Sequence, residues 1–183
     1  MTTLTDARAV ANWYLAKAAV EQDTIDPLKL MKLVYITHGW NLGFTGKPLF
    51  FQRVMAWPHG PVIPEVYHAF KLFGYNPIRT SATFYDHEDD IERPYEARFD
   101  EMEISVLQAS WSKYKPYTGS QLEDLTHLPG TPWSEVTAGL PPGKIRNVPM
   151  PNEIIQKHYE AAIKLNRKRK LEQHRAQLAA SAG

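Results

Sequence analysis

The chain has 183 residues, of which 43% are hydrophobic and 11% aromatic, enough to bury the core of one domain. It contains no cysteine, which excludes disulfides, thiolate catalysis and cysteine-ligated zinc. A formal net charge of +1 gives no overall attraction to nucleic acid or anionic membranes. No apolar run reaches about 18 residues and the N-terminus lacks a signal-peptide pattern, so the protein is expected to be cytoplasmic.

A first helix is indicated near the N-terminus. Thr3 is the predicted N-cap, Asp6 follows three residues later, and Val10 and Tyr14 then recur at helical spacing.

The second helix is predicted to span about residues 27–45. Asp26 and Pro27 are an N-cap and a first-turn proline, while Gly46 suits a left-handed C-terminal residue and Pro48 forbids continuation. Two apolar stripes leave little of this helix for water, so it is expected to be buried at the centre of the fold.

Extended structure is predicted in two places. Residues 49–57 are aromatic and β-branched, which favours one or two short strands, and residues 78–85 favour another. The acidic residues 86–92 are predicted to form a surface loop, since they lack the glycine and the final bidentate glutamate of a calcium loop. A divalent cation site remains the alternative for this loop.

The remaining helices are indicated by proline and capping patterns, which begin at Pro64, Asp100, Thr118, Thr131 and near Asn152. The helix after Asp100 is expected to bury Ile104, Leu107 and Trp111. The fold class is therefore mainly α: a compact multi-helix domain around the buried central helix, with the small β element near 49–57 and 78–85. Residues 1–163 are predicted to form this domain, and residues 164–183 a basic helical tail that frays.

Seven histidines raise the question of metal or acid–base chemistry. His38 lies on a buried stripe, where a core histidine bonded to a neighbouring group is the simpler interpretation. A metal-dependent hydrolase that uses His38, His59 and His127 is the alternative. The sequence has no His-Glu-x-x-His, Gly-x-Ser-x-Gly or calcium-loop motif, so no catalytic residue, metal or cofactor is predicted.

Two surfaces are candidates for partner binding. Trp57, Pro61, Pro64 and Tyr67 form a rigid aromatic and proline patch if exposed, or a turn locked into the core if buried. The basic residues from Lys164 to Lys170 spread around a helix, which is typical of a solvated tail; phosphate contact is the alternative.

The sequence resembles the Panacea domain, the family of SocA-like antitoxins. The resemblance spans roughly residues 8–160 and rests on several runs that recur in order. The residues that carry it include His38, Gly39, Trp40, Lys47, Pro48, Trp57, Gly60, Pro61, Pro64, Tyr67, Thr126, His127, Pro132 and Trp133.

The resemblance implies an antitoxin that neutralises a toxin, usually encoded by the adjacent gene, through direct protein–protein binding. Some members of the family look like proteolytic adaptors that deliver the toxin to a AAA+ protease, and others occur in prophages. The resemblance implies no enzymatic activity, while the net charge and the lack of a long apolar run predict neither a nucleic-acid partner nor a membrane partner. Its signature residues are interpreted as the scaffold, with toxin choice expected in the variable surfaces.

Overall fold

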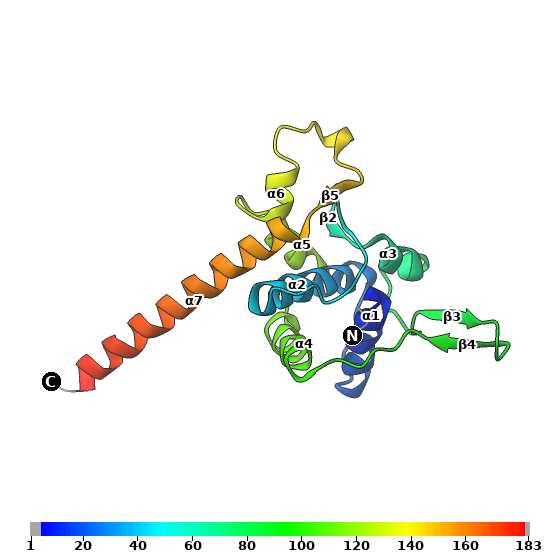
Figure 1. Ribbon diagram of the computed structural model, residues 1–183, viewed down its shortest axis with the longest axis horizontal. Helices are drawn as coiled ribbons and strands as arrows, with labels where there is room; N and C mark the ends of the chain where they lie inside the picture. The colour runs from blue at the N-terminus through cyan, green and yellow to red at the C-terminus, as the bar shows by residue number, and fades with distance from the viewer. Residues whose placement is uncertain (1–4, 182–183) are drawn as a thin grey trace.

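The computed structural model describes residues 5–181 and is mainly helical, as predicted (Figure 1). Its α-helices are α1 Ala7–Val20, α2 Pro27–Thr45, α3 Pro64–Phe70, α4 Glu101–Tyr114, α5 Gly119–His127, α6 Pro132–Val136 and α7 Asn152–Ser181. Two short 3-10 turns, η1 Lys71–Phe73 and η2 Pro142–Lys144, follow α3 and precede the last strand. No helix in this part of the chain is long and apolar enough to cross a membrane.

Helix α2 is the centre of the fold. It contacts α1, α3, α4, α5 and α7, and every residue from Lys29 to Gly39 is buried. This burial on all sides confirms the prediction drawn from its two apolar stripes.

The predicted ends of α2 are also confirmed. The Asp26 carboxylate accepts a hydrogen bond from the Lys29 amide at 3.0 Å, and Pro27 occupies the first turn. At the other end Gly46 has φ 69° and donates its N–H to the Leu42 carbonyl at 2.8 Å. At α1 the N-cap is Asp6, whereas the predicted cap Thr3 lies outside the described residues.

A three-stranded antiparallel sheet lies beside these helices. Strand β1 Val54–Trp57 is central, flanked by β2 Gly60–Val62 and β5 Val148–Met150. The strand predicted within 49–57 is therefore correct for its second half, and Phe50 forms only an isolated bridge with Thr5. Strand β5 is too short, with a proline at its middle, for its sequence to indicate a strand.

The second β element is a separate hairpin of β3 Thr83–Asp86 and β4 Ile91–Pro94, which projects from the helices (Figure 1). The acidic surface loop predicted over 86–92 is correct for the exposed turn 87–90 but wrong at both ends, because Asp86 closes β3 and Ile91 opens β4. Arg93 pairs with Asp86 at 2.8 Å and with Asp89, and these pairs across the turn stabilise the hairpin.

Capping boxes start the next two helices as predicted. At α4 the Glu103 amide donates a hydrogen bond to the Asp100 carboxylate. At α5 the Gln121 amide donates to the Thr118 hydroxyl in the same way. Ile104, however, is 37% exposed, contrary to prediction, because it lies in the first turn of α4, before the buried stretch that begins at Val106.

Helix α7 packs on the second half of α2 through Ile155, Tyr159 and Ile163. Two glycines of α2 permit this close approach: a Cβ at Gly39 would overlap the Tyr159 ring, and one at Gly43 would lie 2.8 Å from the Tyr159 Cβ. Beyond Ile163 the helix continues without a break, and residues 164–177 are exposed. Figure 1 shows this part of α7 extending away from the body of the protein.

Candidate functional site

The turn between β1 and β2 brings together most of the residues singled out from the sequence. Trp57 pairs with Gly60 in the sheet register, so Pro58 and His59 form the connection. Gly60 has φ 96°, a conformation that favours glycine.

Side chains from α5 and α6 hold the start of this turn. The Trp133 indole N–H donates to the Trp57 carbonyl at 2.9 Å, and His127 Nε2 lies 3.2 Å from the Pro58 carbonyl. The His127 and Trp133 rings also pack together, with centroids 3.9 Å apart. The two signature elements, which are distant in sequence, thus act as one structural unit.

Lys32 of α2 holds the rest of the turn. Its ammonium donates to the Pro61 carbonyl at 3.3 Å and to the His59 carbonyl. The side chain is buried, and this burial lowers the pKa of Lys32 to about 8, although the Glu123 carboxylate acts in the opposite direction. Carbonyl dipoles compensate part of the cost of burying the ammonium group.

We refer to Lys32, His127, Trp133 and the turn 57–61 as the carbonyl cluster. Lys32 was not among the functional or scaffold residues predicted from the sequence. The available signal was a lysine between Met31 and Leu33 on a helix that is otherwise apolar on both sides.

Gly60 is also required by the space around it. A Cβ at this position would lie 2.6 Å from Lys32 Nζ, 2.8 Å from Thr126 Oγ1 and 3.1 Å from His127 Cε1. The main chain therefore approaches α2 and α5 more closely than any side chain allows.

Thr126 and Pro132 position α5 and α6 around the carbonyl cluster. The Thr126 hydroxyl donates to the Glu123 carbonyl at 2.7 Å, and the Thr131 hydroxyl donates to the Thr126 carbonyl at 2.8 Å. Thr131 is the N-cap of α6, and the buried Pro132 occupies its first turn. His59 points outward, with 83% of its side chain exposed, and contacts Glu123 at 3.0 Å.

His38 lies elsewhere, in a buried position between α2 and the start of α7. Its Nδ1 accepts a hydrogen bond from the Leu49 amide at 3.3 Å, which leaves Nε2 to donate to Asn152 Oδ1 at 2.9 Å. The ring stacks on Phe50 at 4.1 Å, and burial lowers the pKa of His38 to about 4. It is a core histidine with both ring nitrogens bonded, as the simpler interpretation predicted.

The three histidines of the hydrolase alternative do not converge. His38 bonds to Leu49 and Asn152, whereas His127 bonds to the turn and His59 faces solvent. Within residues 5–181 no three His, Asp or Glu side chains are arranged to hold a metal ion.

The other signature residues lie in the second half of α2 and in the segment that follows it, where they pack around the C-terminal end of the helix. The Lys47 carbonyl accepts a hydrogen bond from Asn41 Nδ2 at 2.9 Å, while the Lys47 side chain is exposed and Pro48 half-buried. Gly39 receives the Tyr159 ring, and the half-buried Trp40 donates its indole N–H to the Tyr114 hydroxyl at 3.1 Å.

The aromatic and proline patch is part core and part surface. Pro61 is buried and Pro64 opens α3, whereas Tyr67 is 39% exposed. The half-buried Trp57 packs edge-on against Tyr67 at 4.9 Å and donates its indole N–H to Asn147 Oδ1 at 2.8 Å. Tyr67 is thus the member of this patch most available to a partner.

Comparisons with known proteins give one consistent result. A model of the family described as antitoxin SocA-like, Panacea domain, matches residues 30–134. The antitoxin SocA of Caulobacter vibrioides (strain NA1000 / CB15N) is 34% identical over 134 residues, which is 73% of this chain and 71% of that protein. No solved structure gives a significant match.

Proposed function

Because this chain belongs to the SocA-like antitoxin family with a Panacea domain, we propose that it neutralises a cognate toxin by direct protein–protein binding. The observation that carries the proposal is the family match over residues 30–134. That range covers α2 from Leu30 onward and the whole carbonyl cluster.

The use of the signature residues in the structure supports a binding function. The signature residues Gly60 and His38 are buried and, together with Lys32, hold the backbone, so they fix the scaffold and leave the surface free to vary. Several large apolar side chains remain exposed, as binding surfaces require. They include Phe44 at 51%, Phe51 at 58%, Leu72 at 93% and Tyr75 at 94% exposure.

Growth of a bacterial host tests this function directly. The product of the adjacent gene is induced alone and together with this chain, and growth is measured. We expect arrest with the neighbour alone and recovery when both are present. Arrest that persists in the presence of well-expressed chain would contradict the proposal.

Stoichiometry separates binding from enzymatic inactivation. A binding antitoxin abolishes the activity of the purified toxin only when the two proteins reach a fixed molar ratio, whereas an enzyme acts well below that ratio. We expect an end point set by the complex, measured by titration of toxin activity. Neutralisation by a small fraction of one equivalent would favour an enzyme.

The fate of the toxin separates sequestration from delivery to a AAA+ protease, the second mechanism that the family resemblance implies. The half-life of the toxin is measured with and without this chain, in cells with and without the protease. Under simple sequestration the half-life does not shorten when the chain is present. A shorter half-life that depends on the protease would identify an adaptor.

A further inference from the structure

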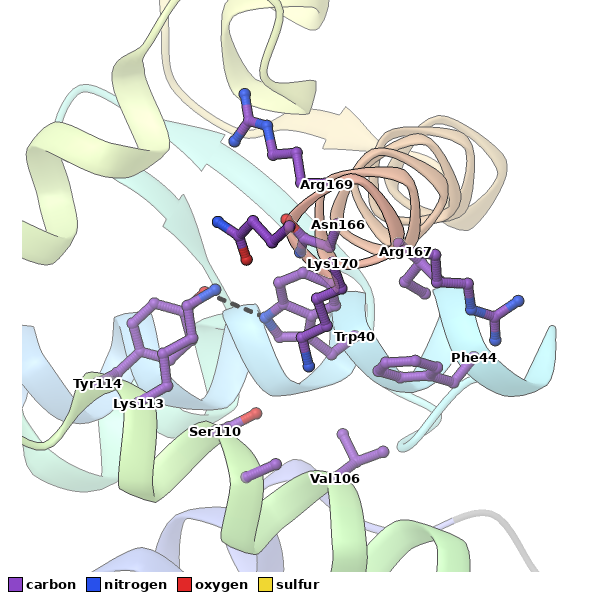
Figure 2. A pocket seen from close by; sticks show the side chains of 13 residues that line it. Trp40, Phe44, Val106, Ser110, Lys113, Tyr114, Asn166, Arg167, Arg169 and Lys170 are labelled. Atoms are coloured by element: carbon purple, nitrogen blue, oxygen red, sulfur yellow. Dashed lines mark hydrogen bonds between the residues drawn. The ribbon is translucent and has the colours of Figure 1, made fainter. Parts of the chain in front are cut away.

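A groove of about 650 Å³ lies between the end of α2, one side of α4 and the exposed part of α7. Figure 2 shows Trp40 and Phe44 between the α7 residues above and Val106 and Ser110 of α4 below. The volume is within the range of sites that enclose a ligand or an inserted side chain.

The floor of the groove is apolar and aromatic. Phe44 is 51% exposed, its ring stacks on Trp40 at 5.9 Å, and Ile163 lies beside them. Contact with water is unfavourable for the exposed apolar surface of this phenylalanine, so a partner that covers the ring gains binding free energy.

The rim of the groove is basic. Four of its lining residues are cationic and none is acidic: Lys113, Arg167, Arg169 and Lys170. In the described part of the chain these four form no salt bridge, whereas Lys168 on the same helix lies 3.9 Å from Glu172. The Lys113 ammonium lies over the Trp40 ring, 4.9 Å from its centroid. Cations that lack a carboxylate partner and surround an apolar floor are complementary to a partner with apolar anchors and carboxylates.

We propose that this groove binds an acidic amphipathic helix of the toxin. The proposal rests on the antitoxin function above and assigns the surface through which it acts. The groove walls follow helical stripes, from Val106 to Tyr114 on α4 and from Ile163 to Gln173 on α7. These stripes are about 12 and 15 Å long at 1.5 Å per residue, which suits two to three turns of an inserted helix.

Two other occupants fit less well. The α7 tail of a second copy carries six Lys or Arg and one Glu between residues 164 and 177, so the basic rim repels it. The acidic β3–β4 hairpin of a second copy offers fewer free carboxylates, because Asp86 and Asp89 already pair with Arg93. Nucleic acid is a third possible occupant, but it binds best to cations arranged in a track that follows its phosphates. The groove instead places four cations around an apolar floor.

A matched pair of double variants tests the groove. Arg167→Glu with Lys170→Glu reverses two rim charges, and Lys164→Glu with Lys168→Glu makes the same change in net charge on residues of α7 that do not line the groove. The probe is the purified neighbour-gene product that arrests growth. We expect the rim variant to bind about 100-fold more weakly and the control within about threefold of wild type.

The outcomes distinguish this inference from the proposed function. If the unmodified chain does not bind the probe, the proposed function fails and this inference fails with it. If the unmodified chain binds and both double variants bind equally well or equally poorly, the groove is not the site while the function stands. All proteins are first compared by circular dichroism and urea unfolding, since the changed residues are exposed and the fold should persist.

A photocrosslinking residue in place of Phe44 gives an independent readout in the purified complex, with the same residue at Leu72 as control. We expect Phe44 to crosslink to a segment of the toxin rich in Asp and Glu. A crosslink to a second copy of this chain, or to a basic segment of the toxin, would overturn the proposal, as would the absence of any crosslink at Phe44.

Discussion

Gly60 is the residue on which the carbonyl cluster depends most directly. Its φ of 96° would strain the backbone of any residue that has a side chain. A Cβ at this position would also meet Lys32, Thr126 and His127. We expect Gly60→Ala to lower the free energy of unfolding by about 2 kcal/mol or more, measured by urea denaturation.

Gly130 provides the matched control for this substitution. It also has a positive φ, of 79°, but a Cβ there would meet no atom within 4 Å. Gly130→Ala therefore carries the backbone cost alone, about 1 kcal/mol. Equal losses for the two variants would mean that the crowding around Gly60 is not important.

His38 makes stability depend on pH. Its pKa is about 4 in the folded chain, against the ordinary value of 6.5 expected once the chain unfolds, so between these values the unfolded chain binds more protons. The contribution of the neutral ring is fully present above about pH 6.5 and falls by about 3 kcal/mol as pH drops through 4. Urea unfolding at pH 7.5, 6 and 4.5 measures this loss.

The control for His38 is a side chain that cannot titrate. His38→Gln keeps a donor and an acceptor, and its stability relative to wild type should therefore improve as pH falls from 7.5 to 4.5. A difference between the two proteins that stays constant over this interval would assign the acid sensitivity to other groups.

At the scale of elements, the crossing of α2 and α7 depends on two glycines, of which Gly39 is the more crowded. Gly39→Ala gains about 1 kcal/mol of helix propensity, yet the methyl group overlaps the Tyr159 ring. We expect a net loss of about 2 kcal/mol in the free energy of unfolding, because overpacking a buried contact outweighs propensity. Urea denaturation of the single variant measures it.

A double-mutant cycle with Tyr159→Leu shows whether the ring is the cause. Removal of the ring leaves room for the methyl group. The double variant should therefore lose less free energy of unfolding than the two single variants lose together. Strict additivity would place the cost of Gly39→Ala elsewhere.

Local rules explain why the helices could be predicted. Asp26 with Pro27 and Asp100 with Glu103 satisfy backbone donors within a few residues, so the signal is contained in a short stretch of sequence. Strand β5 has no such local signal. It exists because Val148–Met150 pairs with β1, almost a hundred residues earlier.

The candidate site could be predicted less completely than the fold. The resemblance named Gly60, His127 and Trp133, but no local pattern indicates that they converge on the carbonyls of one turn. Lys32 was missed because a buried lysine depends on acceptors supplied by tertiary structure. Asn152, the partner of His38, was missed for the same reason.

For the whole molecule, the two parts of α7 differ: the part up to Ile163 packs on α2, and the part beyond it forms one wall of the proposed groove. Side chains 164–177 are exposed, so truncation after Ile163 should change the free energy of unfolding by less than about 1 kcal/mol. The same truncation removes one wall of the groove and should abolish toxin neutralisation. Urea denaturation and the growth assay test the two parts separately. A large loss of stability would contradict the predicted domain boundary at residue 163.

The carbonyl cluster also bears on how such a domain can diversify. Its acceptors are main-chain oxygens, which every amino acid supplies, while the donors Lys32 and Trp133 lie on α2 and α6 and the His127 ring of α5 packs against the turn. Lys32 holds residue 59 by its main-chain carbonyl, while the His59 side chain is 83% exposed and contacts the Glu123 carboxylate at 3.0 Å. Position 59 can therefore change its chemistry while the turn keeps its shape, so one fixed framework can present new surface to new partners.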